Sequence, residues 1–421
     1  MSSPMKSILG EDSRPMKLLE ISPATGSRVF HDVGRGAYAG DPNWIAPLDA
    51  EVEAVFDPKK NSSFRHGEAV RWVLRDDAGR PIGRIAAFVD FEKAKRKDPA
   101  EGGIGFFECP DDQVAADLMF DAAREWLAAR GVQAIDASVN FGANFMNWGV
   151  LIEGFMPQGY GMPYNKPYYA RLFETYGFQE FYRQFSYHKD LAVPFPERMV
   201  RFAEHLIKKG TYTYRPYEKK QAARFVGDLV EILNRTWADY MEDFQPVTTG
   251  EIERIMKSAR PIIVDEFIWF AYKDGKPVGV VVTFPDVNQV LAEFNGRLNW
   301  WRTLRFFRLL KGKTITRNRV FLAGVIPEFQ NSGVIAPLFL HFIRAVEARP
   351  HYKEIELSWV GDYNPRMRKI YEQAGGVHKK THVTYRYLLD RSRPFVRFTN
   401  EGGNSALRKD VVGKEGHLPQ E

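Results

Sequence analysis

Between residues 320 and 376 the spacing of apolar positions changes repeatedly, and each change predicts a new element. An apolar run over 320–326 has the length of a strand, and residues 327–333 follow with the proline and glycine of a tight turn. A helix is predicted next, because three apolar side chains share one helical face: Leu338, Phe342 and Val346. A strand over 355–360 and a helix over 365–373, ended by two glycines, complete a strand-helix-strand-helix unit.

The N-terminal half shows related patterns. Residues 70–74 and 82–88 read as the two strands of a hairpin around a turn at 77–81. A helix is predicted over 113–130 and a strand over 134–139. Short motifs also recur between the halves in the same order: Gly79, Pro81, Gly83, Phe88 and Asp90 return as Gly275, Pro277, Gly279, Phe284 and Asp286, the Leu118 helix and Asp136-x-Ser138 return as the Leu338 helix and Glu356-x-Ser358, and Tyr187 and Asp190 return as Tyr387 and Asp390. Matched order over three blocks indicates a tandem duplication.

The duplication predicts two α/β (α+β) domains, each with a mixed twisted sheet flanked by helices. The expected division is a flexible leader 1–15, an N-terminal domain 16–190, a linker 191–216, a C-terminal domain 217–392 with an insertion at 290–319, and a flexible tail 393–421. In the first copy, the position that corresponds to the 327–333 turn is occupied by Phe107-Glu108-Cys109-Pro110, and no glycine follows it. We therefore expect only the second copy to bind phosphate.

Composition narrows the class of protein. The 421 residues are 44% hydrophobic and 14% aromatic, enough to build the cores of two domains. The single cysteine, Cys109, excludes an internal disulfide and a multi-thiolate metal site and suits a reducing compartment. Neither an eighteen-residue apolar stretch nor a signal-peptide core is present. We expect a cytoplasmic protein that at most lies on the inner face of a membrane.

A helix that opens directly after a strand points unpaired backbone N–H groups and a positive dipole end into solvent, so the turn after residue 326 suits a pyrophosphate. This arrangement resembles the GNAT acyl-CoA N-acyltransferase superfamily, whose acyl-CoA loop reads Gln/Arg-x-x-Gly-x-Gly/Ala. Gln330 and Gly333 match that loop, while Ile335 replaces its last small residue and Ala336 comes one position late. The superfamily's later Asn-to-Tyr segment is matched by Asn364, Met367, Tyr371 and Gly375.

The resemblance implies two GNAT-like domains in tandem, acyl-CoA as the donor substrate and a set of residues that bind it: Gly324, Val325, Ile326, Gln330, Asn331, Ser332, Gly333, Val334 and Asn364. Backbone N–H groups near Gly324 to Ile326 would stabilise the thioester oxyanion if the strand bulges there. The superfamily's opening helices border the acceptor site, which would lie near Trp237, Tyr240 and Phe244. Helical spacing alone favours a core position for these aromatic residues.

Acyl transfer to an amine needs an acid for the leaving thiolate and a base for the amine. Tyr371 is positioned like the superfamily's general acid; as a residue on an apolar helix face it could equally be core. Glu356 and Asp362 are candidate proton acceptors, and we expect burial to raise the pKa of Glu356. His378 and His382 have no third ligand nearby, so no metal is expected.

Residues 300–319 form a basic, aromatic segment with seven positive and no negative charges. On a helix, Trp300, Thr303, Leu304, Phe307 and Leu310 would form one stripe and Arg302, Arg305 and Arg308 the opposite side, with Trp301 adjoining. Three interpretations remain: contact with an anionic membrane surface or lipid, packing of the stripe on the domain, and RNA binding, which is the least favoured.

Several segments are similar to those of a bacterial GNAT-like family that includes the bacterial ceramide synthases: Gly40-Asp41-Pro42-Asn43-Trp44, Phe56-Asp57-Pro58-Lys59-Lys60-Asn61, Tyr164-Asn165-Lys166-Pro167-Tyr168-Tyr169 and Glu356-Leu357-Ser358-Trp359. This resemblance implies N-acylation of a long-chain sphingoid base, 3-ketosphinganine or sphinganine, by a fatty acyl-CoA. The alternatives are an acetyl-CoA-dependent acetyltransferase for small amines, an aminoacyl-tRNA-dependent transferase of the Fem type, and a scaffold that binds no CoA.

Overall fold

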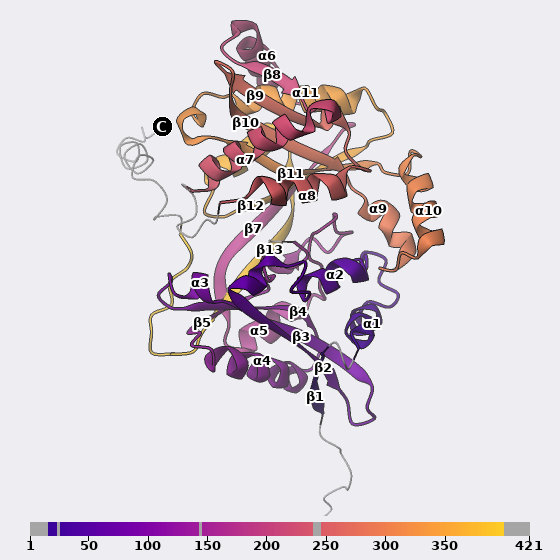
Figure 1. Ribbon diagram of the computed structural model, residues 1–421, viewed down its shortest axis with the longest axis vertical. Helices are drawn as coiled ribbons and strands as arrows, with labels where there is room; N and C mark the ends of the chain where they lie inside the picture. The colour runs from indigo at the N-terminus through magenta and orange to yellow at the C-terminus, as the bar shows by residue number, and fades with distance from the viewer. Residues whose placement is uncertain (1–15, 23–25, 143–144, 239–245, 400–421) are drawn as a thin grey trace, which may run out of the picture. The chain divides into compact units, whose positions relative to one another are not determined.

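The computed structural model describes residues 16–22, 26–142, 145–238 and 246–399, which form two compact units (Figure 1). Unit 1 contains the chain up to Trp148, the segment Asn165–Gln179 and the segment Arg386–Arg393. Unit 2 contains Gly149–Tyr164, Glu180–Tyr385 and the chain from Pro394.

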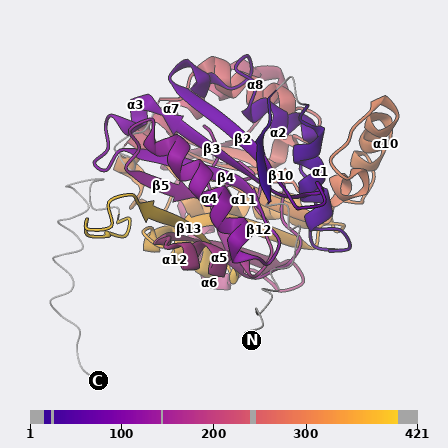
Figure 2. The same cartoon turned by 90° about the horizontal axis from the view of Figure 1, so that it is seen from below.

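Unit 1 is built on strands in the order β1-β2-β3-β4-β5. Helix α4 lies over β3, as Figure 2 shows from below. The elements are β1 (Lys17–Glu20), α1 (Arg28–Ala37), α2 (Asp49–Val55), η1 (Ser62–Arg65), β2 (Gly67–Arg75), β3 (Pro81–Asp90), α3 (Phe91–Ala94), β4 (Glu101–Glu108), α4 (Gln113–Ala128), β5 (Ala134–Ala137) and α5 (Tyr169–Tyr176). The predicted hairpin is confirmed, since β2 and β3 pair antiparallel.

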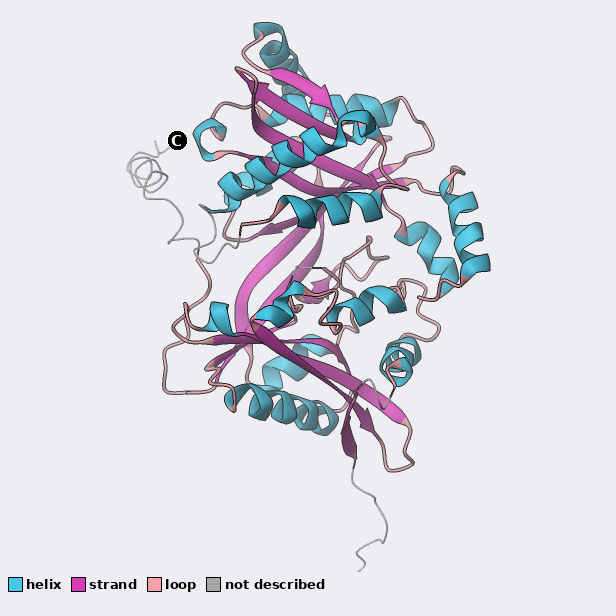
Figure 3. Ribbon diagram, in the orientation of Figure 1, coloured by secondary structure: helices cyan, strands magenta, loops and turns pink. Residues whose placement is uncertain are grey.

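Unit 2 has the strand order β13-β7-β12-β11-β10-β9-β8, and β6 pairs with β13 (Figure 3). Its elements are β6 (Val150–Glu153), β7 (Gln179–Asp190), α6 (Glu197–Lys209), β8 (Thr213–Pro216), η2 (Lys219–Gln221), α7 (Ala222–Ala238), α8 (Thr249–Ala259), η3 (Asp265–Phe267), β9 (Ile268–Lys273), β10 (Lys276–Pro285), α9 (Asn288–Leu291), η4 (Ala292–Phe294), α10 (Trp300–Leu310), β11 (Arg317–Val325), η5 (Pro327–Phe329), α11 (Ile335–Glu347), β12 (Glu354–Gly361), α12 (Pro365–Gln373) and β13 (Val377–Leu388).

The predicted strand-helix-strand-helix unit is present as β11, α11, β12 and α12. The three apolar residues that predicted α11 are buried: Leu338, Phe342 and Val346. At the end of α12, Gly375 has φ +79°, a conformation that glycine adopts without the steric cost of a Cβ atom. The mixed α/β class and the repeated order of elements in the two units are therefore confirmed.

Several pieces of chain do not follow the expected domain boundaries. Residues 149–164, expected in the N-terminal domain, belong to unit 2. Residues 180–190 of β7, expected in the N-terminal domain, belong to unit 2 and pair with β12. The end of β13, expected in the C-terminal domain, belongs to unit 1 and lies beside β5. The segment expected to be a linker contains α6 and β8, both in unit 2.

Candidate active site at the fork between two strands

The turn between β11 and α11 presents free backbone donors. Between Gln330 and Ile335, the N–H groups of Asn331 and Gly333 have no acceptor within the part of the chain that the structure describes. Helix α11 begins after Val334, whose side chain gives no capping hydrogen bond. The Ala336 N–H donates to the Gly333 carbonyl and Pro337 has no N–H, so the free donors are those of Asn331 and Gly333, beside the positive dipole end of α11 that favours an anion.

Unit 1 differs at the corresponding position. Asp112 precedes α4, and its carboxylate accepts hydrogen bonds from the N–H groups of Val114 at 2.8 Å and Ala115 at 3.4 Å. A negative side chain thus already neutralises this helix start, and a second anion there would be repelled.

Helix α6 packs beside the unit 2 turn. Gly333 has φ +75°, and a Cβ atom there would lie 2.7 Å from the ring of Phe202 on α6. Gln330 holds the other side of the turn, since its side-chain amide donates to the Val325 carbonyl at 3.2 Å and its own carbonyl accepts from Arg366. The turn is therefore held in one conformation by neighbours from three elements.

Strands β11 and β12 separate just before this turn. They pair in parallel only from Arg317 opposite Glu354 to Val320 opposite Leu357, so Phe321–Val325 and Ser358–Gly361 form a fork. The register of β11 against β10 shifts at Phe321, where β11 carries an extra residue. The expected bulge therefore exists, but at Phe321 and not at Gly324 to Ile326, which pair with β10 and with Val278.

Tyr371 lies at the level where the fork opens. It is 3% exposed on α12, and its ring contacts that of Tyr187, whose Cα lies opposite Leu357. Burial raises the pKa of the Tyr371 hydroxyl, and the positive charge of Arg319 partly opposes that rise. Tyr371 therefore stays protonated at neutral pH, as a proton donor must.

Arg319 was not predicted as a site residue. It is 5% exposed on β11, donates from Nε to Ser358 Oγ at 2.9 Å, and lies over the Phe321 ring at 4.5 Å. Its Nη1 is buried and has no hydrogen-bond partner within the described chain. Its place in a basic run led sequence reasoning to count it as a surface charge, although alternation along the predicted strand could have indicated burial.

Glu356 is fully buried at the centre of an ion network. Its Oε1 accepts from Lys380 Nζ at 3.0 Å, and its Oε2 lies 3.7 Å from Arg317 Nε. Burial by itself would raise the pKa of Glu356, but the charges of Lys380, Arg317 and His188 outweigh it and hold the pKa well below its ordinary value. The expectation of a raised pKa was wrong, because these cations could not be located from the sequence.

His188 on β7 is the second site residue that the sequence did not reveal. Its Cα lies opposite Glu356, and its Nε2 is 3.7 Å from Glu356 Oε1. Burial lowers the pKa of His188, but the carboxylates of Glu354 and Glu356 overcome this, so the pKa is raised above its ordinary value. A raised pKa favours the protonated imidazole, so His188 holds a proton more strongly than an ordinary histidine does.

A segment of irregular chain covers this polar face. The Pro157 carbonyl accepts from Lys380 Nζ at 3.2 Å and from Arg317 Nη1 at 3.3 Å, and the Tyr160 N–H donates to Asp286 Oδ1 at 2.9 Å. Gly159 fits only without a side chain, since a Cβ atom there would lie 2.9 Å from Glu356 Oε2. Residues 157–160 are therefore held by hydrogen bonds over the ion network around Glu356.

The remaining predicted residues lie elsewhere. Asp362 is five positions beyond Leu357, about 16 Å along an extended strand, and binds Arg397 at 2.9 Å. Asn364 caps α12 by accepting from the Met367 N–H at 3.1 Å. Trp237 is on α7 without a described side chain, and Tyr240 and Phe244 lie outside the described residues.

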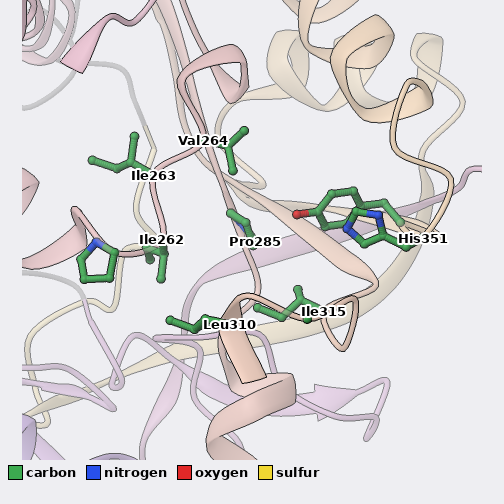
Figure 4. Close-up of a pocket in the computed structure, with 10 residues that line it drawn as sticks. Ile262, Ile263, Val264, Pro285, Leu310, Ile315 and His351 are labelled. Atoms are coloured by element: carbon green, nitrogen blue, oxygen red, sulfur yellow. The ribbon is translucent and has the colours of Figure 1, made fainter. Parts of the chain in front are cut away.

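Neither a group of potential metal ligands nor the cavity found in the described part of the chain coincides with the fork. No group of three potential metal ligands occurs among the described residues, and His378 Nε2 donates to the Lys380 carbonyl at 3.1 Å. One cavity of about 100 Å³ lies at the C-terminal end of α10 (Figure 4). Its lining is largely apolar and includes Ile263, Leu310 and Ile315, but none of the predicted catalytic residues.

Comparison with known proteins gives both a family and a fold. The chain is 31% identical over 359 residues to the bacterial ceramide synthase of Caulobacter vibrioides (strain NA1000 / CB15N), an alignment that covers 83% of this chain and 92% of that protein. No family model matches the chain.

Two solved structures share its fold at 12% identity. A tandem GNAT protein from the clavulanic acid biosynthesis pathway aligns with TM-score 0.51 over 90% of this chain and all of its own. The glucosamine N-acetyltransferase region of a fungal multi-domain β-N-acetylglucosaminidase aligns with TM-score 0.55, and the alignment covers 90% of this chain and 38% of that protein.

Proposed function

The chain belongs to the bacterial ceramide synthase family of acyl-CoA-dependent N-acyltransferases, and from this premise we propose that it acylates a long-chain sphingoid base, 3-ketosphinganine or sphinganine. The observation that carries the proposal is the fork between β11 and β12. An uncapped helix start lies beyond its open end, and Tyr371 and Arg319 lie where the strands separate.

In the proposed reaction, Asn331 and Gly333 at the turn bind the diphosphate of acyl-CoA, and its thioester arm enters the fork. The amine nitrogen attacks the thioester carbon, and backbone N–H groups near the Phe321 bulge receive the oxyanion. Collapse forms the amide bond and breaks the carbon-sulfur bond. Tyr371 gives its hydroxyl proton to the departing thiolate, and the Arg319 guanidinium stabilises the phenolate that remains.

The attacking nitrogen loses one proton, which we assign to the Glu356 and His188 pair. Glu356 alone is a weak base because its pKa is depressed, whereas the raised pKa of His188 suits proton uptake. Both side chains are buried, and Gly159 lies against Glu356, so this assignment requires the covering segment to move when the amine binds. Asp362 is the less favoured acceptor because it follows Gly361, the last residue of the fork, and already pairs with Arg397.

Both proposed substrates carry long apolar chains, which places the reaction at a membrane surface, on its cytoplasmic side. Among the described helices, none has the length and hydrophobicity needed to span a bilayer. The sphingoid base and the fatty acyl chain would then enter the protein from the membrane surface.

Mass spectrometry of products from the purified protein tests the proposal. Palmitoyl-CoA with a sphingoid base should give an N-acyl sphingoid product that depends on enzyme, time and both substrates. Acetyl-CoA with polyamines is the matched control and should give little product. Preference for the control pair would replace the proposal with a small-amine acetyltransferase, and transfer only from aminoacyl-tRNA would identify a Fem-type enzyme.

A further inference from the structure

Helix α10 exposes an apolar face that nothing in the described chain covers. Trp300, Trp301, Leu304 and Phe307 are 61%, 64%, 56% and 41% exposed. Four large apolar side chains so close together forgo the free energy that burial would give them. In Figures 1 and 2 the helix projects from the body of unit 2.

The opposite side of α10 attaches the helix to its own unit. Arg302 Nη1 donates to the carbonyls of Phe294 at 3.3 Å and Arg297 at 3.2 Å, and Arg305 pairs with Glu293. Phe306 packs on Phe294, and Leu310 lines the cavity at the C-terminal end of α10 (Figure 4). The helix is thus held by one face while the tryptophan-bearing face stays outside. Of the predicted stripe, Leu310 lines the cavity, whereas Trp300, Leu304 and Phe307 remain exposed, so most of its large apolar side chains do not pack on the domain.

Charge on and beside the exposed face is positive. At 100° per residue, Lys311 falls between Trp300 and Leu304 around the helix, and Arg308 falls between Leu304 and Trp301. The expectation that Arg308 lies opposite the stripe was therefore wrong. Lys313 follows and is exposed, and residues 295–319 contain no acidic side chain. Arg317 and Arg319 do not contribute, because they are buried on β11. The surface cations of this segment therefore lie on both sides of the helix: Arg308, Lys311 and Lys313 lie next to the apolar stripe, and Arg302 and Arg305 are exposed on the other side, where Arg305 pairs with Glu293.

We propose that α10 docks the protein on the surface of an anionic lipid bilayer. The exposed stripe enters the boundary between headgroups and acyl chains, where tryptophan and phenylalanine are favoured, and Arg308, Lys311 and Lys313 meet lipid phosphates. An aliphatic residue such as Leu304 gains by entering hydrocarbon but gains little from base stacking. A single convex helix also offers no groove to follow a nucleic-acid strand, so lipid fits this surface better than RNA.

Cosedimentation with lipid vesicles tests the docking and needs no substrate, so its outcome is independent of acyl transfer. The wild-type chain should bind vesicles of phosphatidylcholine mixed with phosphatidylglycerol and bind phosphatidylcholine alone much more weakly. Added salt should weaken the binding, because exposed charges are screened. No binding to anionic vesicles, or RNA binding without vesicle binding, would overturn the proposal.

Two triple variants separate the apolar and charged contributions. Trp300→Ser, Leu304→Ser and Phe307→Ser together should lower the vesicle partition coefficient at least about 10-fold, while equally exposed Val193→Ser, Ile255→Ser and Val377→Ser should leave it unchanged. Arg308→Gln, Lys311→Gln and Lys313→Gln should reduce anionic binding by about 10-fold or more and flatten its salt dependence. The charge-matched control changes Lys208, Lys209 and Lys220 to Gln, and equal loss in test and control sets would refute α10 as the docking element.

Discussion

At the scale of single residues, chemistry at the fork depends on charge placed next to buried groups. Tyr371 keeps its proton because it is buried, and Arg319 supplies the positive charge that makes loss of that proton tolerable. His188 and Glu356 form a second pair. Burial disfavours the charged form of each residue, and the opposite charges around it favour that form again. These four residues come from four different elements, β7, β11, β12 and α12.

Tyr371→Phe removes only the hydroxyl, so we expect kcat to fall by roughly 10²- to 10⁴-fold, the usual contribution of a general acid. The free energy of unfolding should change little, because the ring still packs against Tyr187. Steady-state kinetics and urea denaturation measure the two effects. Tyr352→Phe, another buried tyrosine of unit 2, is the control. Unchanged turnover in Tyr371→Phe would remove this residue from the mechanism.

His188→Gln should change the pH dependence of both activity and stability. The folded protein raises the pKa of His188, so its protonated form stabilises the fold by about 1 kcal/mol for each unit of the shift. That stability is fully present below the unfolded pKa of about 6.5 and is lost as pH rises through the higher folded pKa. Urea unfolding across this range should show the loss in the wild-type chain and not in the variant.

Activity should show the opposite trend with pH. A neutral imidazole is needed to accept the proton, so wild-type kcat should rise with pH through the folded pKa of His188, and His188→Gln should lose this rise together with most of its turnover. A variant that keeps the wild-type pH profile would show that the proton goes elsewhere, and Asp362→Asn would then be the next variant to compare.

At the scale of elements, the important contrast is between the starts of α4 and α11. Asp112 occupies the first, whereas the second has no side-chain cap and stays available to a ligand. The turn before α11 keeps its form through Gly333, which combines a positive φ with a close approach to α6. Helix α6, within the segment that sequence reasoning assigned to a linker, therefore helps to shape the turn that we propose binds acyl-CoA.

Gly333→Ala tests this element directly. A Cβ atom at φ +75° costs about 1 kcal/mol and would press on the Phe202 ring, so the turn should distort. We expect the KM for acyl-CoA to rise by about 10-fold or more with a smaller effect on kcat. Gly275→Ala is the matched control, because Gly275 has φ +76° in a hairpin turn with no atom within 4 Å. If both variants leave the KM unchanged, Gly333 does not shape the binding turn.

At the scale of the whole molecule, each unit contains strand residues from the other half of the sequence. Unit 1 includes the end of β13, where Arg386 pairs with Asp136 at 2.7 Å and with Glu101 at 2.5 Å. Unit 2 includes Glu180–Asp190 of β7, paired along β12. A cut at residue 190 would therefore remove a ladder partner from each unit.

Expression of the two halves tests this exchange. Residues 16–190 and 191–399, produced separately, should aggregate or remain unfolded, because each would expose an unpaired strand edge. Coexpression should restore folded protein and a share of its activity. Circular dichroism and gel filtration follow folding, and the intact chain is the control. Two separately folded, soluble halves would contradict the exchange.

The sequence by itself determined the elements and much of their order. Helix, strand and turn depend on local spacing, glycine and proline, so the β11 to α12 unit and the β2–β3 hairpin could both be predicted, and both are confirmed. Motif spacing also indicated Tyr371 and the turn at Gln330 and Gly333, because both motifs lie within one short stretch of chain.

Only the tertiary structure decided which side chains meet at the fork and which faces stay outside. His188 and Glu356 are 168 positions apart in the sequence and adjacent on paired strands. The pKa of Glu356 is lowered, and not raised as burial alone would make it, because Lys380 and Arg317 lie beside it on other strands. Trp300 and Leu304 of α10 are exposed because Arg302 and Phe306 attach the other face of the helix to unit 2. Electrostatic environment and solvent exposure depend on neighbours in space, which local spacing along a chain does not specify.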